Sequence, residues 1–134
     1  GEKLGTRGEG RGKSIKNNSD SWPVFRPSPL APDPMILEVA ILNVIPGREA
    51  EFEDAFRQAQ RIISTMSGYR SHELRRCIET ANRYILLVNW DKLEDHTTGF
   101  RGSPGYQKWK QLLHHFYDPF PAVEHYTAVS GVPD

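Results

Sequence analysis

The feature that most constrains the fold is an apolar segment that lacks a polar face. Residues 36–45 read Ile-Leu-Glu-Val-Ala-Ile-Leu-Asn-Val-Ile, with β-branched and apolar side chains at both odd and even positions. Successive side chains of a strand point to opposite faces, so a strand of this composition has to be covered on both sides. The segment predicts a sheet that has a packing layer on each face.

Two later segments have the period of an amphipathic helix. Acidic residues gather at the start of the first one, directly after the break at Pro46-Gly47, where the helix dipole favours negative charge. Spacings of three and four residues then give each segment one apolar stripe. The stripes consist of Phe52, Phe56, Ala59, Ile63 and Met66 in the first helix, which ends near Ser67-Gly68, and of Tyr106, Trp109, Leu113 and Phe116 in the second, at 103–117.

Three further segments have the alternation or composition of strands. Residues 69–79 and 83–90 are joined by only three residues, Thr80-Ala81-Asn82, which predicts an antiparallel hairpin. Residues 122–129 alternate again near the end of the chain. The resulting order is strand, helix, strand, strand, helix, strand. This order predicts an α+β fold of the ferredoxin-like, split βαβ type, with a four-stranded antiparallel sheet and both helices on one face.

An arrangement with both helices on one face leaves the other face of the sheet open. The first strand is apolar on both faces, with Leu37, Val39 and Ile41 alternating with Ile36, Ala40 and Leu42, so the open face also needs a cover. A second copy that packs sheet against sheet is the economical cover, and we therefore expect a homodimer through the sheet face.

Residues 1–34 differ from the rest of the chain. The first twenty are rich in Gly, Lys, Arg, Ser and Asn, and residues 22–34 contain five prolines. Such a composition cannot bury enough apolar surface to fold alone. We expect a disordered or extended tail at 1–34 and a single domain at 35–134.

Composition also bears on partners and location. Seventeen basic and seventeen acidic residues give no net charge, so nothing in the overall charge favours nucleic acid or an anionic membrane. The single cysteine, Cys77, fits a reducing compartment, and no apolar run approaches the roughly 20 residues of a membrane span. The expectation is a soluble, cytoplasmic protein.

The candidate site is the segment that follows the third predicted strand, because side chains converge on open space where strands pass into helices. His96 is a candidate general base and Arg101 a candidate stabiliser of an anion, although His96 could instead cap a helix and Arg101 could pair with Glu94 or Asp95. The adjacent His114 and His115 lie about 100 degrees apart on a helix and cannot share one ion, so no metal is expected. Candidate substrate-binding residues, each of which could also be plain core, are Trp90, Tyr106, Trp109 and His72.

Five short pieces occur in order between residues 35 and 130. They are Val44-Ile45-Pro46-Gly47 with Glu51-Phe52, then Met66-Ser67-Gly68-Tyr69, Val88-Asn89-Trp90, Glu94-Asp95-His96, and the close from Pro119 to Tyr126. Together they resemble an antibiotic biosynthesis monooxygenase domain. The resemblance implies a dimeric α+β barrel and an oxygenation that needs no cofactor. In that chemistry a small aromatic, phenolic or quinol substrate is deprotonated and its anion reduces dioxygen.

The resemblance also carries over to single residues. In quinone-forming members a Trp at the end of the third strand and a polar ring residue six positions later line the pocket. Trp90 matches the first, while His96 stands where those enzymes have a Tyr, and a His can act as a base near neutral pH. Heme-degrading members, an alternative, use an Asn early in strand one, a Trp after strand three and a His on the second helix. Here Ala40 or a neighbour occupies the strand-one position, and Trp109 is near the position of the helical His. A non-catalytic barrel that binds a small hydrophobic ligand is the other alternative.

Overall fold

The computed structural model describes residues 35–132, so the predicted tail at 1–34 lies outside the described residues. The order of elements is the predicted one, with a short π-helix and a 3-10 turn added. The elements are β1 (Ile36–Asn43), α1 (Glu49–Ile63), β2 (Tyr69–Arg76), β3 (Arg83–Trp90), η2 (Asp95–Phe100), α2 (Pro104–Leu113), η3 (His114–Phe116) and β4 (Val123–Tyr126).

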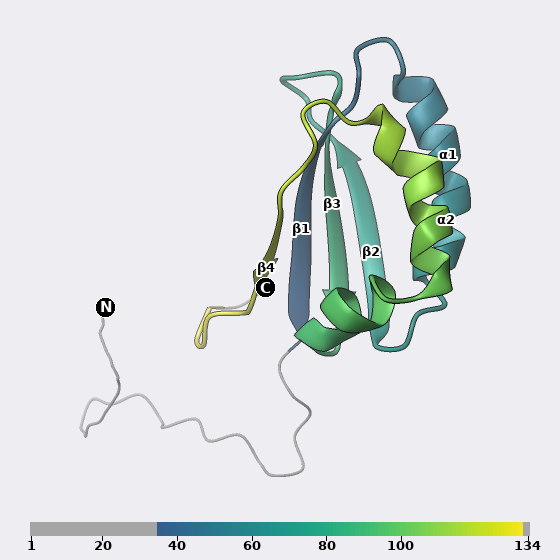
Figure 1. Ribbon diagram of the computed structural model, residues 1–134. Helices are drawn as coiled ribbons and strands as arrows, with labels where there is room; N and C mark the ends of the chain where they lie inside the picture. Colours follow the sequence, from purple (N-terminus) through teal and green to yellow (C-terminus); the bar gives the residue numbers. More distant parts are fainter. Residues whose placement is uncertain (1–34, 133–134) are drawn as a thin grey trace, which may run out of the picture. The chain divides into compact units, whose positions relative to one another are not determined.

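The four strands form one antiparallel sheet in the order β2-β3-β1-β4, and both long helices cover the same face of it (Figure 1). This confirms the predicted ferredoxin-like α+β arrangement. The register matters for the site. Glu38 in β1 pairs with Val88 of β3 on one side and with His125 of β4 on the other, while Ile36 pairs with Trp90.

The core lies between the sheet and the two helices. Phe52, Phe56, Ala59 and Ile63 form the buried stripe of α1, as their spacing predicts. Opposite them, the alternate residues of β3 from Tyr84 to Trp90 are buried. Complete burial of an aliphatic or aromatic side chain stabilises a fold by about 1.5–3 kcal/mol, so this layer supplies much of the driving force for folding.

The other face of the sheet is only partly covered. Leu37 and Val39 are half-buried, and Ile41 is 41% exposed. Ile85 and Leu87 of β3 lie beside them on the same face. The apolar face that motivates the homodimer is therefore present, and the homodimer itself stays a prediction.

The observed elements are shorter than the predicted ones at several ends. β1 stops at Asn43, and Val44 then forms a single bridge with Tyr117. The second helix begins at Pro104, where the Ser103 hydroxyl accepts a hydrogen bond from the Tyr106 backbone, and it gives way to η3 after Leu113. Among residues 35–132, no helix combines the length and the apolar character that a membrane span requires.

Candidate active site

A cavity of about 340 Å³ lies within the domain. β1 and β3 supply one wall, and η2, α2 and the segment that follows η3 supply the other. Its ring-bearing walls suit a flat apolar ligand, and its few charged groups could orient one. The charged or titratable lining residues other than tyrosine are Glu38, His96, Arg101 and His114, and the aromatic ones are Phe100, Tyr106, Trp109, Tyr117 and Phe120.

The carboxylate of Glu38 is the unexpected feature of this cavity. Glu38 points to the helix side of β1, together with Ala40 and Leu42, and is only 5% exposed. Its Oε1 accepts a 2.9 Å hydrogen bond from the indole Nε1 of Trp90 and lies 3.4 Å from Nε2 of His96. A carboxyl group this deep in a domain is rarely found without such partners.

His96 is held in place by the π-helix η2 and by Trp90. The residue is 3% exposed, and its imidazole stacks on the Trp90 indole with 5.5 Å between the ring centroids and an interplanar angle of 29°. The backbone N–H of Arg101 donates to the His96 carbonyl at 3.1 Å, a bond that spans five residues and defines the wide turn. Such π-turns occur often at functional sites, where they aim one side chain away from the helical pattern.

His125 completes a row of three polar side chains. Its Nε2 lies 2.8 Å from Nδ1 of His96, so one of these nitrogens carries the shared proton and the other accepts it. The β1–β4 register, in which Glu38 faces His125, brings the edge strand to this point. His96 therefore lies between a buried carboxyl group and a half-buried imidazole.

Burial shifts the protonation of the row toward neutral forms. It raises the pKa of Glu38, an effect that the Trp90 hydrogen bond and the nearby Arg101 oppose. It lowers the pKa of His96 to about 3, and the positive charge of Arg101 acts in the same direction. The pKa of His125 is lowered by the same two causes. At neutral pH the two imidazoles are uncharged, so each has one N–H donor and one acceptor nitrogen.

Arg101 lies at the rim of the cavity rather than inside it. The side chain is exposed, yet it lines the cavity and its charge acts on Glu38, His96 and His125. The structure has no ion pair between Arg101 and the neighbouring Glu94 or Asp95, the alternative that the sequence left open. The guanidinium is thus free of those carboxylates and could meet an anionic ligand at the cavity mouth.

The polar row is not arranged as a metal site. No three His, Cys, Asp or Glu side chains in the described part of the chain are placed to hold a metal ion. The geometry of His96 gives the reason. Its two nitrogens point to Glu38 and to His125 respectively, so these three side chains cannot converge on one ion.

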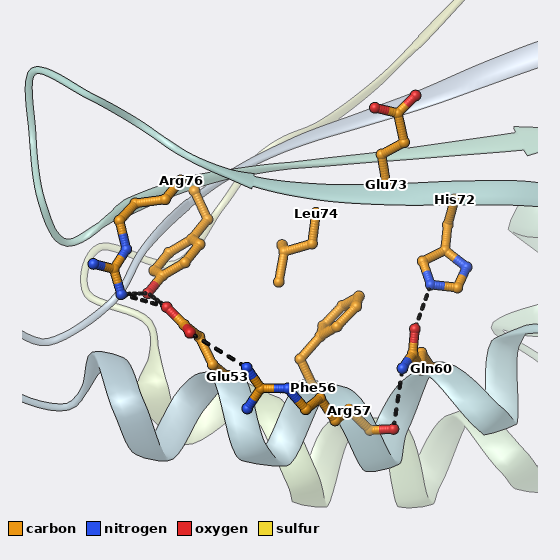
Figure 2. A pocket seen from close by; sticks show the side chains of 9 residues that line it. Glu53, Phe56, Arg57, Gln60, His72, Glu73, Leu74 and Arg76 are labelled. Atoms are coloured by element: carbon orange, nitrogen blue, oxygen red, sulfur yellow. Dashed lines mark hydrogen bonds and ion pairs between the residues drawn. The ribbon is translucent and has the colours of Figure 1, made fainter.

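A second hollow, of about 650 Å³, lies between α1 and β2, as Figure 2 shows. Its polar side chains other than Glu73 are hydrogen-bonded or ion-paired to each other. The Tyr84 hydroxyl donates to Glu53 at 2.6 Å, Arg76 pairs with the same carboxylate, and Nε2 of His72 is 2.8 Å from the Gln60 amide oxygen. Because these polar groups already have partners, we regard this hollow as structural and the cavity at Glu38 as the candidate active site.

Known proteins share both the sequence pattern and the fold. The profile of the antibiotic biosynthesis monooxygenase family matches residues 35–112, which is more than half of the chain. The chain belongs to the antibiotic biosynthesis monooxygenase family. The resemblance deduced from the short pieces is thereby confirmed.

Individual members of the family cover the same part of the chain. YczJ of Bacillus subtilis (strain 168), an uncharacterized protein, is 59% identical over 95 residues, which are 71% of this chain and all of that protein. A candidate antibiotic biosynthesis monooxygenase from Bordetella bronchiseptica has a crystal structure with a TM-score of 0.70 and 36% identity. That match covers 72% of this chain and 99% of the Bordetella chain. SnoaB of Streptomyces nogalater, a cofactor-independent oxygenase, shares the fold with a TM-score of 0.66 at 20% identity, over 76% of this chain and all of SnoaB.

Within this family fold, the predicted site residues lie in three places. His96, Arg101, Tyr106 and Trp109 line the one cavity. Trp90 is fully buried behind His96 and Glu38 and does not line it. His72 lies apart, in the hollow between α1 and β2, because its strand is at the edge of the sheet away from β1 and β4.

Glu38, His125 and Tyr117 are among the residues of this site that the sequence did not single out. Glu38 is the one charged residue in the apolar strand at 36–45, and its inward position in the alternation is a signal that could have found it. His125 could not be placed without the β1–β4 register. Tyr117 lines the cavity from an irregular segment, and burial, with the charge of Glu38 as a second cause, raises the pKa of its phenol.

Proposed function

We propose that this member of the family is a cofactor-independent monooxygenase that oxidises a small aromatic, phenolic or quinol substrate with dioxygen. The observation that carries the proposal is the buried Glu38–His96 pair on the wall of an aromatic-lined cavity of about 340 Å³. Because burial raises the pKa of Glu38, its ionised form is a stronger base than an exposed carboxylate and is suited to removing a hydroxyl proton from a substrate bound among aromatic rings.

The chemistry needs few groups from the protein. The pair removes the hydroxyl proton, the electron-rich anion passes an electron to dioxygen, and recombination forms a bond from oxygen to a ring carbon. Return of one proton gives a hydroperoxide, which loses water to leave the quinone. For a simple phenol the balance is one phenol and one dioxygen to one quinone and one water. The substrate anion is the reductant, so the proposal requires no flavin or metal.

The other lining residues have supporting roles in this proposal. Tyr106, Trp109 and Phe100 form aromatic walls that hold a flat ring, and Phe100 packs edge-on against both of the others. Arg101 at the cavity mouth stabilises the substrate anion and the oxygen that becomes negative. Trp90 acts indirectly by bonding Glu38 and stacking on His96.

A homodimer is part of the same proposal. The open sheet face carries Leu37, Val39, Ile41, Ile85 and Leu87, and apolar side chains on one continuous face favour a second copy as the cover. The free Cys77 agrees with the cytoplasmic location expected from the sequence.

Oxygen consumption tests the activity. Purified protein without added flavin or metal is mixed with a panel of hydroquinones and polyphenols in an oxygen electrode. We expect uptake above autoxidation, a decrease of about 100-fold in His96→Ala, and a decrease on the order of 10- to 100-fold in Arg101→Ala. His115→Ala is the matched control, because His115 is exposed and does not line the cavity.

Each result has a defined meaning. Uptake that is the same in His96→Ala and wild type, with both proteins folded, would remove His96 from the reaction. Uptake at background for the whole panel would favour a non-catalytic barrel that binds a small hydrophobic ligand. Hemin titration followed by its Soret band would then test the heme-binding alternative.

A further inference from the structure

We propose that Glu38, His96 and His125 form a proton relay, in which Glu38 takes the proton from the substrate hydroxyl and His125 holds it near the surface while the anion reacts with dioxygen. The inference rests on the proposed function and assigns each step to a named atom. It adds His125 to the reaction and makes Glu38 the member of the pair that contacts the substrate.

The three groups form a continuous path from two buried side chains to a half-buried one. Oε1 of Glu38 is 3.4 Å from Nε2 of His96, and Nδ1 of His96 is 2.8 Å from Nε2 of His125. Glu38 and His96 are 5% and 3% exposed, whereas His125 is half-buried on the edge strand β4. The path therefore leads from the cavity wall toward the edge of the sheet. An imidazole is suited to the middle position because it can gain a proton at one nitrogen and release one at the other.

The two oxygens of Glu38 have different surroundings. Oε1 receives the Trp90 N–H and lies against His96. Oε2 forms no hydrogen bond with any residue between 35 and 132, although the side chain is buried and lines the cavity. A buried carboxylate oxygen without a partner is costly, so a ligand hydroxyl is the group expected there. Glu38, rather than His96, is then the residue that touches the substrate.

The proton count closes over one turnover. Glu38 takes the hydroxyl proton at Oε2, and a half-turn of its carboxyl group then presents that proton to Nε2 of His96, which lies beside Oε1 in the resting state. Nδ1 of His96 passes its own proton to Nε2 of His125. The anion is then separated from the proton by two imidazoles and persists long enough to meet dioxygen. The hydroperoxide needs one proton, which returns along the same path in reverse. No net proton is consumed, and both imidazoles recover their starting tautomers without turning.

Neighbouring charged and titratable groups determine how long the proton stays on His125. Arg101 disfavours positive charge on both histidines, so the protonated His125 is a transient state rather than a resting one. The Tyr117 phenol faces Glu38 across the cavity and keeps its own proton at neutral pH, because burial raises its pKa. These neighbours favour the return of the proton to the hydroperoxide.

Chemical rescue of His125→Ala tests the relay. We expect kcat for oxygen uptake to fall about 100-fold in this variant, with KM within about twofold of wild type because substrate binding is unchanged. Free imidazole should restore most of the rate, since the site lies on an edge strand. Glu38→Gln should also lose about 100-fold and should not respond to imidazole. His115→Ala serves again as control and should behave as wild type.

The results separate the relay from the activity. An unchanged rate in His125→Ala, or a lower rate that imidazole does not restore, would overturn the relay even if the oxygenase reaction is present. If no substrate is oxidised, 4-nitrophenol is titrated into the protein and its phenolate absorbance is followed against pH. Ionisation of the bound phenol at lower pH in wild type than in His125→Ala would support the relay. Identical titrations, or no binding of 4-nitrophenol, would overturn it.

Discussion

The indole Nε1 of Trp90 donates a 2.9 Å hydrogen bond to Oε1 of Glu38, across 52 positions of sequence. Trp90 thus serves the candidate site without lining the cavity, because it fixes the carboxyl group and stacks on the imidazole that lies beside it. The role of the Trp90 indole is therefore to position Glu38 and His96 rather than to contact the substrate.

Trp90→Phe should therefore lower the stability of the protein by more than the smaller size of the side chain alone would. The variant keeps an aromatic ring but leaves the buried Glu38 without its N–H donor, which we expect to lower the free energy of unfolding by about 2–3 kcal/mol. Trp109→Phe is the matched control, since Trp109 is also buried but has no hydrogen bond to Glu38. Urea denaturation of both variants measures the difference, and equal losses would contradict the special role of the Trp90 N–H.

The buried pair should give the protein a defined response to acid. Burial lowers the pKa of His96 to about 3, whereas the unfolded chain titrates near 6.5. Between these values the unfolded state binds more protons, so the free energy of unfolding falls as the pH is lowered. Glu38 acts in the opposite direction: its raised pKa makes the folded state hold its proton, and that contribution is lost as the pH rises through the raised pKa.

Without Glu38, the effect of His96 on the pH dependence of the free energy of unfolding should be larger. From pH 7 to pH 4, Glu38→Gln should lose roughly 3 kcal/mol more than the double variant Glu38→Gln/His96→Gln. Wild type should lie between the two, because its Glu38 opposes the effect of His96. Urea titrations at several pH values give the slopes. Three parallel stability curves would show that His96 does not titrate as the burial of the site predicts.

The turn before β2 should be sensitive to any side chain. Gly68 has a φ of +83°, and a Cβ there would lie 2.0 Å from Oδ2 of Asp95, the residue at which η2 begins. Gly47 has a similar φ of +93° but open space around it. We expect Gly47→Ala to lose about 1–2 kcal/mol from strain alone. Gly68→Ala should lose about 1 kcal/mol more, because Asp95 must release the Lys92 N–H. Equal losses in thermal or urea unfolding would contradict the contact.

The open sheet face gives a prediction for assembly. Light scattering of the wild type should give twice the chain mass of 15.3 kDa. Val39→Lys, which places a charge in the middle of the apolar face, should give the mass of one chain. Ile78→Lys is the control, because Ile78 is 94% exposed in the connection between β2 and β3. A wild-type mass of one chain at micromolar concentration would refute the dimer.

The sequence predicts the fold well because the fold depends on periodicity. The apolar strand at 36–45, the helical stripes and the short hairpin connection each identify one element or one connection. Together they are compatible with one topology. The residues at which helices and strands begin and end are less predictable. Val44, assigned to the first strand, leaves the sheet because it bridges Tyr117, a contact between segments far apart in sequence.

The site is less predictable because it depends on register. Nothing in the sequence states that Glu38 lies opposite His125, or that the π-turn of η2 brings His96 against both. His72 points toward the helices, as its alternation with Leu74 predicts. Its strand, however, lies at the edge of the sheet away from β1 and β4, so His72 is far from the cavity to which it was assigned. The local period of a strand tells which face of the sheet a side chain points to, whereas the order of the strands decides which other side chains lie near it.

The most direct test of the account is the rate of oxygen uptake with a hydroquinone panel, compared between wild type and Glu38→Gln at the same protein concentration. The substitution keeps the shape of the side chain and an oxygen that can accept the Trp90 N–H, and it removes only the proton acceptor. The account predicts uptake above autoxidation in wild type and a decrease of about 100-fold in Glu38→Gln. Equal uptake in two folded proteins would contradict the assignment of this buried carboxyl group to the reaction.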